Sequence, residues 1–487
     1  MSRTSQIDIN HGVLIRIGSI ADELNVEAYV VGGYVRDKLL GKEAKDIDIV
    51  VVGDGIVFAK SVSERFGIKS PVIYEKFGTA MLLLDDGKIE FVTAREELYD
   101  SSSRKPRVKQ ATLESDLSRR DFTINALAAS VNKDKFGEII DPFDGEKDIE
   151  HRIIRTPLDP TKTFDDDPLR MMRAIRFVAQ LVARSVDDSH VSAKHFHIEE
   201  ETYRAIRRMA QRIKIVSKER ITEEFLKIMS SQKPSAGLTL FVDTGLATNV
   251  LPELVEMIGV EQRKDYHHKD VFLHTLKVVD SISQFSENVW LRFAGLFHDI
   301  AKPRTKAFVE GTGWTFHGHE EIGARMIAPM FRRLRLPMDK LPYIEKLVRL
   351  HLRPMVLVSG EVTDSAIRRL LFQAGEDIDD LMALCRADIT SQNPQRVVRF
   401  LNNYDVVVQK MKDVEERDRL RNWQPPVRGD EIMEVCRLEP GPLVGKLKDM
   451  IQEAILDGHI PNEHDEALQY LLQIKDHILS EKTIESP

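Results

Sequence analysis

The hydrophobic pattern of this sequence changes near residue 160, and this change limits the folds open to the chain. Before it, short runs rich in β-branched residues alternate with helical segments. After it, apolar residues recur every three to four positions and strand patterns disappear. At 487 residues the chain is also too long for a single hydrophobic core. The pattern therefore predicts an α/β domain followed by several all-helical domains.

Two apolar runs in the first part are predicted to be strands, residues 28–31 and residues 46–52. Two more runs, residues 79–84 and 88–93, flank the turn sequence Asp85-Asp86-Gly87. An Asp-Gly pair between such runs is typical of a β-hairpin. In the helical part, a segment rich in Pro and Gly at residues 422–431 predicts a linker before a small helical tail.

The composition excludes several classes of protein. No apolar run approaches the length of a membrane span, and residues 1–10 lack the apolar stretch of a signal peptide. The two cysteines, Cys385 and Cys436, exclude a disulfide framework and a cysteine-based zinc site, and they fit a reducing compartment. We therefore expect a cytoplasmic protein without membrane contact. The sequence does not determine the oligomeric state.

A pair of carboxylates, Asp46 and Asp48, gives the first chemical signal. Residues two apart on a strand face the same side, and neighbouring carboxylates repel unless a cation lies between them. Mg²⁺ prefers such oxygen ligands. Glu90, in the neighbouring hairpin strand, offers a third acid, and three acids can hold two metals about 3.5–4 Å apart for in-line phosphoryl transfer. The alternative interpretation is two exposed acids at a strand start.

A turn built from Gly32 and Gly33 precedes these carboxylates, between the first strand and a short predicted helix. Glycines allow backbone N–H groups to approach a phosphate closely, and the helix N-terminus favours an anion. Arg36, one turn into the helix, could also reach a phosphate. On its own, a Gly-Gly turn is weak evidence because ordinary turns also use it.

Together these motifs resemble the class II nucleotidyltransferases of the polymerase-β superfamily, which include the tRNA CCA-adding enzymes and bacterial poly(A) polymerases. The resemblance covers about half the chain. Its segments are GGYVRDKLLG…KDIDIVVVG (32–53), REELYDSSSRKPRV (95–108), SRRDFTINALA (118–128), DPFDGEKDI (141–149), DDPLRMMRAIRF (166–177) and SKERITEEF (217–225).

The resemblance implies a role for each matching residue. Asp46 and Asp48 would be catalytic Mg²⁺ ligands that activate an RNA 3′-hydroxyl, with Glu90 as the third acid. A second set would bind the incoming nucleotide through its phosphates, ribose and base. This set comprises Gly32, Gly33, Arg36, Arg120, Asp121, Asp167, Arg170 and Arg173.

Within this set, Asp167 and Arg170 match the pair that reads the base in the resembling family. A carboxylate accepts a hydrogen bond from the amino group of C or A, and a guanidinium donates to the adjacent ring nitrogen. The plain alternative is a helix with Asp167 as its N-cap and Pro168 at its first position. The family usually has Glu where this chain has Asp166, a change from which we expect little effect.

A second constellation lies in the helical part. His274, the doublet His298-Asp299, and Asp388 resemble the H…HD…D pattern of HD phosphohydrolases. Such nitrogen and oxygen ligands suit a divalent transition metal that activates water for phosphoester hydrolysis. Three further histidines, His317, His319 and His351, lie nearby in the sequence, and Lys302 could hold a phosphate. The alternative is a set of packed core histidines.

The net charge of −8 argues against a generally basic nucleic-acid surface, but a local stripe can suffice for RNA. The basic residues between 203 and 227 form such a stripe, and we expect Arg204, Arg208 and Arg212 to contact tRNA. A solvated helix face is the alternative interpretation.

We expect an α/β nucleotidyltransferase head with a polymerase-β-like mixed sheet, followed by an all-α neck, an HD body and a small helical tail. The expected bounds are 1–155, 156–228, 229–420 and 421–487. The expected function is template-independent addition of C, C and A to tRNA 3′ ends from CTP and ATP, with HD-type phosphohydrolysis as a side activity. The intact segment 95–108 resembles the flexible loop of family members that add the terminal A, and this resemblance favours CCA addition over CC addition alone. The alternatives are a poly(A) polymerase, an HD phosphohydrolase with a relic head, and a non-catalytic RNA-binding protein.

Overall fold

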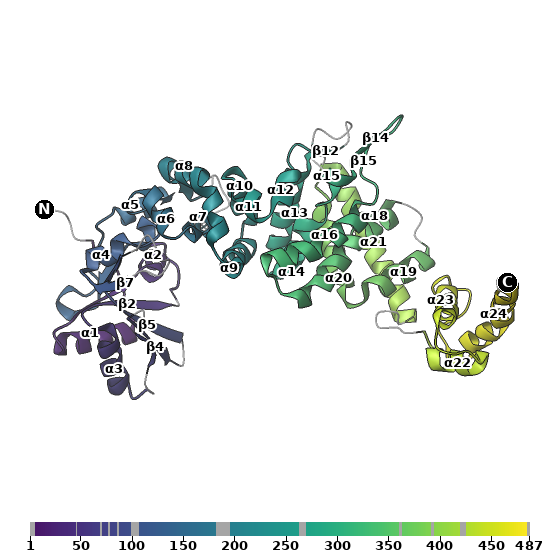
Figure 1. Ribbon diagram of the computed structural model, residues 1–487, viewed down its shortest axis with the longest axis horizontal. Helices are drawn as coiled ribbons and strands as arrows, with labels where there is room; N and C mark the ends of the chain where they lie inside the picture. Colours follow the sequence, from purple (N-terminus) through teal and green to yellow (C-terminus); the bar gives the residue numbers. More distant parts are fainter. Residues whose placement is uncertain are drawn as a thin grey trace. The chain divides into compact units, whose positions relative to one another are not determined.

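The computed structural model describes residues 5–44, 46–68, 71–75, 78–84, 87–98, 107–181, 195–262, 269–359, 363–390, 394–418 and 425–484. These residues form two compact units, Met1–Pro252 and Glu253–Pro487 (Figure 1). Most of the segment 95–108 that resembles a flexible family loop lies outside the described residues.

The first unit begins with a seven-stranded mixed sheet in the order β3-β4-β5-β2-β1-β8-β9. The strand pair β2 and β5 is parallel, and the other neighbouring pairs are antiparallel. The predicted mixed sheet and the hairpin β4–β5 are confirmed. The strands are β1 (Glu27–Val31), β2 (Ile47–Val52), β3 (Val72–Tyr74), β4 (Thr79–Leu84), β5 (Gly87–Thr93), β8 (Ala128–Ser130) and β9 (Ile139–Ile140). A separate antiparallel pair consists of β6 (Arg95–Leu98) and β7 (Arg107–Gln110).

Helices cover this sheet because alternate strand residues are apolar. The helices α1 (Gly12–Glu23) and α3 (Gly55–Phe66) pack on the sheet, and α3 is capped by Asp54, which accepts from two backbone N–H groups. A buried cluster joins Val50 of β2 to Leu113 and Leu117 of α4 (Leu113–Ser118). Asp48 lies two residues before Val50 and therefore shares its side of the sheet. The remaining helices of the head are α2 (Gly33–Leu39), η2 (Thr123–Asn125), η3 (Lys133–Lys135) and α5 (Gly145–His151).

A helical neck completes the first unit. Its central helix α7 packs against α9 and α10, and its buried residues include Met171, Ile175 and Phe177. The neck comprises α6 (Pro160–Asp166), α7 (Leu169–Gln180), α8 (Glu200–Met209), η4 (Ala210–Ile215), α9 (Lys218–Met229), α10 (Pro234–Asp243) and α11 (Leu246–Val250), with the parallel pair β10 (Ile153–Ile154) and β11 (His197–Ile198). Because α10 packs on α7 and α11 packs on η4, the compact unit extends beyond residue 228, where the sequence suggested a boundary.

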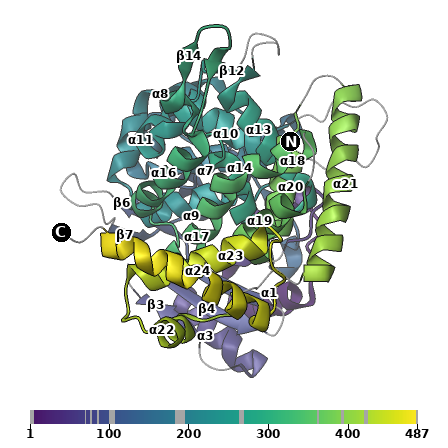
Figure 2. The same ribbon diagram turned by 90° about the vertical axis from the view of Figure 1, so that its right-hand side faces the viewer.

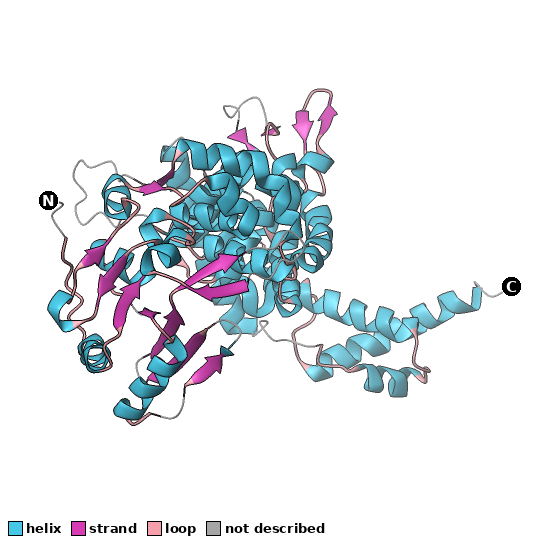
Figure 3. Ribbon diagram, turned by 60° about the vertical axis from the view of Figure 1, so that its left-hand side comes forward, coloured by secondary structure: helices cyan, strands magenta, loops and turns pink. Residues whose placement is uncertain are grey.

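The second unit is a helical body. It comprises α12 (Pro252–Glu256), α13 (Val271–Phe285), α14 (Val289–Phe297), α15 (Lys302–Thr305), α16 (His319–Leu334), η5 (Met338–Lys340), α17 (Leu341–Leu350), α18 (Leu352–Ser359), α19 (Asp364–Ala374), η6 (Gly375–Asp377), α20 (Ile378–Asp388) and α21 (Pro394–Asp418). Two short pairs, β12 (Glu261–Gln262) with β13 (Lys269–Asp270) and β14 (Ala307–Val309) with β15 (Gly313–Thr315), interrupt it (Figure 3). The expectation of no strands after residue 160 was therefore wrong, because strands of two or three residues are too short to show alternation.

Three helices at the end of the second unit form the tail with its own apolar core (Figure 2). They are α22 (Gly429–Cys436), α23 (Pro442–Leu456) and α24 (His464–Ile484). Ile432, Leu447 and Leu471, one from each helix, are buried together. Both cysteines are buried as free thiols. None of the described helices is long and apolar enough to cross a membrane.

Candidate functional site

A polar pocket of about 350 Å³ lies in the first unit, where the sheet, the segment after α4 and the start of α7 meet. All eight residues predicted to bind a nucleotide line it, together with Asp48. Its lining residues are Gly32, Gly33, Arg36, Asp48, Arg119, Arg120, Asp121, Asn125, Asp167, Arg170, Arg173 and Arg220. Six arginines face three aspartates, so the pocket has an excess of three positive charges and suits a polyanion such as a triphosphate.

The turn between β1 and α2 requires glycine at Gly32 for two reasons. Its φ angle of 69° lies in the left-handed region that other residues rarely adopt. A Cβ atom there would also lie 2.8 Å from Nη1 of Arg120. The turn therefore brings the backbone at the start of α2 against the Arg120 guanidinium.

The predicted metal carboxylates lie on neighbouring strands. Asp48 of β2 is paired in register with Glu90 of β5, so the two side chains share one side of the sheet. Asp46 is exposed just before β2, with Oδ1 3.9 Å from Nζ of Lys88. Burial raises the pKa values of Asp48 and Glu90, and their mutual proximity raises that of Glu90 further.

Among the described residues, Asp46, Asp48 and Glu90 do not form a three-ligand group with donor atoms within 4.8 Å. The sheet fixes the positions of the backbone, whereas the three side chains do not yet converge. The donor set consists of oxygens, which suits Mg²⁺.

Buried polar contacts fix the residues of the RRD motif. Asp121 Oδ2 accepts from Nε of Arg173 at 2.7 Å, and Oδ1 accepts from Nδ2 of Asn125 at 2.9 Å. The oxygen of Asn125 in turn accepts from Nη1 of Arg36 at 2.7 Å. Burial opposes the charge on Asp121, but Arg173 and Asn125 outweigh it and lower the pKa of this carboxyl. The network links α2, the RRD motif and α7.

The two adjacent arginines of that motif share one buried acid. Asp116 in α4 accepts from Nη2 of Arg119 at 2.7 Å and from Nη2 of Arg120 at 3.2 Å. Although burial raises the pKa of Asp116, the two guanidinium groups outweigh this effect and lower it. Asp116 therefore positions both arginines at the pocket.

The side chains of the two residues predicted to read the base have different hydrogen-bond partners, although the backbone N–H of Arg170 donates to the carbonyl oxygen of Asp167 at 3.0 Å. Asp167 accepts from Arg220 of α9 through both oxygens, at 2.7 and 3.4 Å. Arg170 donates to the backbone carbonyl of Arg119 at 2.6 Å. Asp167 also accepts from the N–H of Leu169 at 3.2 Å, so it acts as a capping group, although α7 begins at Leu169 and not at Pro168.

Sequence reasoning missed three lining residues, Arg119, Asn125 and Arg220. All three lie within segments that carry the family resemblance, and this was the signal available for them.

The three arginines of the basic stripe that are expected to contact tRNA lie on α8 and η4. Arg204 forms an ion pair with Glu200, 2.6 Å away, and Arg212 forms one with Asp165 at 2.7 Å. Arg208 donates to the hydroxyl of Thr161 at 2.9 Å. These side chains are exposed or half-buried, so a polyphosphate backbone could exchange with their present partners.

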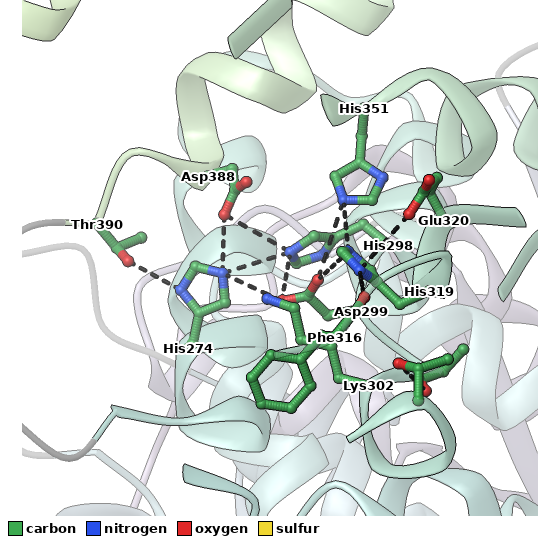
Figure 4. Close-up of polar contacts among 12 residues, drawn as sticks. His274, His298, Asp299, Lys302, Phe316, His319, Glu320, His351, Asp388 and Thr390 are labelled. Atoms are coloured by element: carbon green, nitrogen blue, oxygen red, sulfur yellow. Dashed lines mark hydrogen bonds and ion pairs between the residues drawn. The ribbon is translucent and has the colours of Figure 1, made fainter. Parts of the chain in front are cut away.

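A separate polar cluster lies in the second unit (Figure 4). The four residues predicted for an HD site meet there. Nε2 of His274 is 2.8 Å from Oδ1 of Asp388, and Nε2 of His298 is 3.2 Å from Oδ2 of Asp299. Lys302 donates to Oδ2 of Asp299 at 2.7 Å. Nitrogen and carboxylate donors at these separations fit a divalent transition metal.

Electrostatics at this cluster favour ionised carboxylates. Burial opposes the charges, but His298 and Lys302 hold the pKa of Asp299 well below its usual value. Burial also opposes the protonation of His298, yet Asp299 and Asp388 raise its pKa to about 10. Burial lowers the pKa of His351 to about 3. Sequence reasoning assigned no role to His319 and His351, which the structure places in the cluster, whereas His317 is exposed outside it.

A mixed sheet that carries paired acids beside an arginine-rich pocket defines the class of the first unit, which is a nucleotidyltransferase. Three family models match the chain. They are "Poly A polymerase head domain" at residues 28–155, "Probable RNA and SrmB- binding site of polymerase A" at 195–258, and "HD domain" at 271–393.

The chain belongs to the tRNA nucleotidyltransferase family. It is 30% identical over 444 residues to the A-adding tRNA nucleotidyltransferase of Deinococcus radiodurans, a match that covers 89% of this chain and 92% of the relative. It is 33% identical over 323 residues to the multifunctional CCA protein of Ralstonia nicotianae, a match that covers 64% of this chain and 69% of that relative. The A-adding tRNA nucleotidyltransferase of Aquifex aeolicus is 41% identical over 293 residues, a match that covers 58% of this chain and 32% of that relative.

The fold is similar to that of the Bacillus stearothermophilus CCA-adding enzyme solved in complex with CTP. The TM-score is 0.64 at 24% identity, and the match covers 96% of this chain and 98% of the other. The family models and relatives confirm the predicted enzyme class, and the fold match confirms the predicted fold class.

Proposed function

We propose that the protein adds C, C and A to the 3′ ends of tRNA from CTP and ATP. The observation that carries this proposal is the single pocket in which all eight expected nucleotide-binding residues meet Asp48. The names of the relatives support tRNA as the acceptor, and the match at residues 195–258 supports an RNA contact in the neck.

In this reaction the 3′-oxygen of the tRNA forms a bond to the α-phosphorus of the nucleotide. The bond between the α-phosphorus and the oxygen that bridges it to the β-phosphorus breaks, pyrophosphate leaves, and the proton of the 3′-hydroxyl passes to water. Asp46, Asp48 and Glu90 would hold Mg²⁺, which supplies charge neutralisation and lowers the pKa of the attacking hydroxyl. The arginines of the pocket bind the triphosphate, and Asp121 with Asn125 holds Arg173 and Arg36 in place.

We propose that Asp167 and Arg170 select the base. Asp167 can accept from the amino group of C or A, and Arg170 can donate to the adjacent ring nitrogen. U and G present a keto oxygen there, so the carboxylate would face an unpaired acceptor at a cost of about 1–3 kcal/mol. Arg220 fixes the orientation of the Asp167 carboxylate.

Addition of A alone is a second candidate function. The relatives from Deinococcus radiodurans and Aquifex aeolicus are named A-adding enzymes, whereas that from Ralstonia nicotianae is named a multifunctional CCA protein. A chain that adds only A would use the same pocket on a tRNA that already ends in CC.

One experiment separates the candidates. Purified protein is incubated with tRNA transcripts that end before CCA, after C or after CC, and with each labelled nucleotide in turn. CCA addition predicts incorporation of two C residues and then one A. Incorporation of A on the CC-ending transcript alone would identify an A-adding enzyme, and long A tracts would identify a poly(A) polymerase.

We also propose that His274, His298, Asp299 and Asp388 form a separate hydrolytic site for phosphate esters. A transition metal there would supply an activated water. Metal-dependent release of phosphate from a 3′-phosphorylated RNA, lost in Asp388→Ala, tests this proposal.

A further inference from the structure

A short β-hairpin in the second unit carries aromatic side chains on its outer face. It consists of β14 and β15, and Figure 1 shows it projecting from the helices of that unit. Phe308 and Trp314 are direct partners across the two strands, so their side chains share one face. Thr315, the next residue along β15, is on the other face and is buried. The hairpin therefore turns its aromatic face away from the helices.

This aromatic face is open to solvent. Phe308 is 65% exposed and Trp314 is 40% exposed, and no other large aromatic side chain in the described part of the chain is as exposed as Phe308. The two ring centroids lie 5.4 Å apart at an interplanar angle of 75°. In such an edge-to-face pair each ring contacts its partner on one side only, so Phe308 keeps one ring face free. Adjacent exposed aromatic rings are typical of a binding surface, whereas single exposed apolar residues need no explanation.

A lysine lies beside these rings. Nζ of Lys306 is 4.6 Å from the centroid of the Trp314 ring, which is a cation–π contact. Within the residues that the structure describes, Lys306 forms no ion pair, whereas Lys302 and Arg304 are each paired with an acid. Glu310 in the turn is the single acid of the hairpin sequence. A ligand with both a flat ring and a negative charge would complement this surface.

Both ends of the hairpin are anchored at the proposed hydrolytic site (Figure 4). Before β14, Lys302 donates to Oδ2 of Asp299 at 2.7 Å. After β15, the carbonyl oxygen of Phe316 lies 2.7 Å from Nδ1 of His319, whose Nε2 is 3.4 Å from Oδ1 of Asp299. Trp314 precedes Phe316 by two residues, or about 7 Å of extended chain. A ligand with its phosphate at the buried cluster is therefore within reach of the aromatic face.

We propose that this hairpin binds the single-stranded 3′ end of an RNA whose terminal phosphate enters the hydrolytic site. A base near that end stacks on the free face of Phe308, Trp314 supports the ring from the side, and Lys306 neutralises a backbone phosphate. Stacking of this kind tolerates any base, because every base has a π face. The inference rests on the hydrolytic site proposed above and assigns it a polynucleotide substrate in place of a small phosphate ester.

The exposed apolar area favours a nucleobase over a protein as the occupant. Stable protein–protein interfaces bury about 800 Å² on each partner. The apolar surface of the hairpin consists of Phe308, Val309 and Trp314, which are 65%, 42% and 40% exposed. A large aromatic side chain buries about 150–250 Å² when it is covered completely. Three partly covered side chains therefore fall short of a protein interface, whereas a base needs only a ring face of its own size.

Hydrolysis of two substrates tests the proposal. One is a short oligoribonucleotide with a 3′-phosphate, and the other is glycerol 2-phosphate, which has no ring and no RNA backbone. Phe308→Ala should raise KM for the oligonucleotide by roughly 5- to 150-fold, the loss expected for one stacked base, and the effect on glycerol 2-phosphate should be much smaller. Phe308→Tyr keeps a flat ring and should retain most of the wild-type affinity. Val309→Ala, at an exposed position on the opposite face of the hairpin, is the matched control.

A second measurement does not depend on hydrolysis. The oligonucleotide carries 5-iodouridine next to its 3′ end and terminates in a 3′-hydroxyl, so there is no phosphate to remove. Irradiation should cross-link the modified base to Phe308 or Trp314, as located by mass spectrometry, and unmodified RNA should compete. Lys306→Glu should lower the yield and make it less dependent on salt, because a phosphate contact is lost.

The outcomes separate this inference from the hydrolytic function on which it rests. Equal losses for both substrates in Phe308→Ala would overturn the inference, since the hairpin would then act only on the structure of the site. An unchanged KM together with a change of oligomeric state in size-exclusion chromatography would also overturn it and assign the face to a second copy of the chain. Absence of a cross-link at the hairpin would overturn it whatever the hydrolytic activity. A cross-link in a protein that hydrolyses no phosphate ester would uphold the RNA contact and overturn only the hydrolytic function.

Discussion

Asp167 and Arg220 form a two-oxygen ion pair at the edge of the nucleotide pocket, with nitrogen–oxygen distances of 2.7 and 3.4 Å. The two residues come from different elements, since Asp167 precedes α7 and Arg220 lies in the first turn of α9. Asp167 is the residue expected to accept from the incoming base. If Asp167 selects the base as proposed, Arg220 would act on base selection through the orientation of that carboxylate.

The first prediction concerns this pair. Asp167→Ala and Arg170→Ala should admit UTP and GTP more than they reduce the intrinsic rate, and Arg220→Ala should do the same more weakly. The discrimination of CTP and ATP from UTP and GTP should decrease by about 1–3 kcal/mol, which is roughly 5- to 150-fold in the ratio of their kcat/KM values. Arg220→Lys should restore part of it, and Lys218→Ala on the same helix is the control. An equal decrease for all four nucleotides would show that the pair is only structural.

A single metal site should serve both C and A. We expect Asp46→Ala and Asp48→Ala to lower the addition of both nucleotides by at least about 1,000-fold, because the charge neutralisation by the metal is removed. Binding of tRNA, measured by filter retention, should be unchanged, as should the circular dichroism spectrum. The exposed Asp134→Ala is the matched control. Retained A addition in either variant would contradict the single site.

The basic stripe should bind phosphates of the tRNA backbone. Charge reversal to Glu at Arg204, Arg208 and Arg212, one at a time and together, should weaken tRNA binding. The slope of log K against log salt should become shallower by roughly 0.7–0.9 for every phosphate that the variant no longer neutralises. Lys60→Glu, on the exposed surface of α3, should leave the slope unchanged. If the triple variant keeps the wild-type slope, the stripe is a solvated helix face.

Stability at acid pH should depend on Asp116. Its pKa is lowered in the folded protein, so its contribution is complete above the unfolded pKa of about 3.9 and is lost as the pH falls through the lower folded value. Between about pH 4 and 3, the unfolding free energy of the wild type should therefore fall more steeply than that of Asp116→Asn. The slopes should differ by at most about 1.4 kcal/mol per pH unit in urea titrations. Identical slopes would show that Asp116 does not contribute to the pH dependence of the unfolding free energy.

The two chemical centres should work independently. Because each centre lies within its own compact unit, the double variant Asp299→Ala/Asp388→Ala should keep nucleotide addition within about twofold of the wild type. It should lose any metal-dependent phosphatase activity. Loss of nucleotide addition by a variant that remains folded would mean that the centres are coupled.

The sequence by itself determined the α/β head, the helical remainder and the identity of most pocket residues. Local patterns were sufficient there, because apolar and polar residues alternate along a strand, whereas apolar residues recur every three to four positions along a helix. Gly32, Asp48 and the RRD motif carry chemistry that depends on residue type and short spacing. The same reasoning found His274, His298, Asp299 and Asp388, because they occur in the order of a known pattern.

Only the tertiary structure decided which residues meet across long separations. Arg220 contacts Asp167, which lies 53 residues earlier in the sequence, and His351 contacts His319, which lies 32 residues earlier. No local sequence pattern predicts either contact. Of three histidines equally visible in the sequence, two enter the polar cluster of the second unit and His317 remains exposed. The physical reason is that packing of helices fixes where side chains converge, and packing depends on the whole set of buried surfaces, not on any one segment.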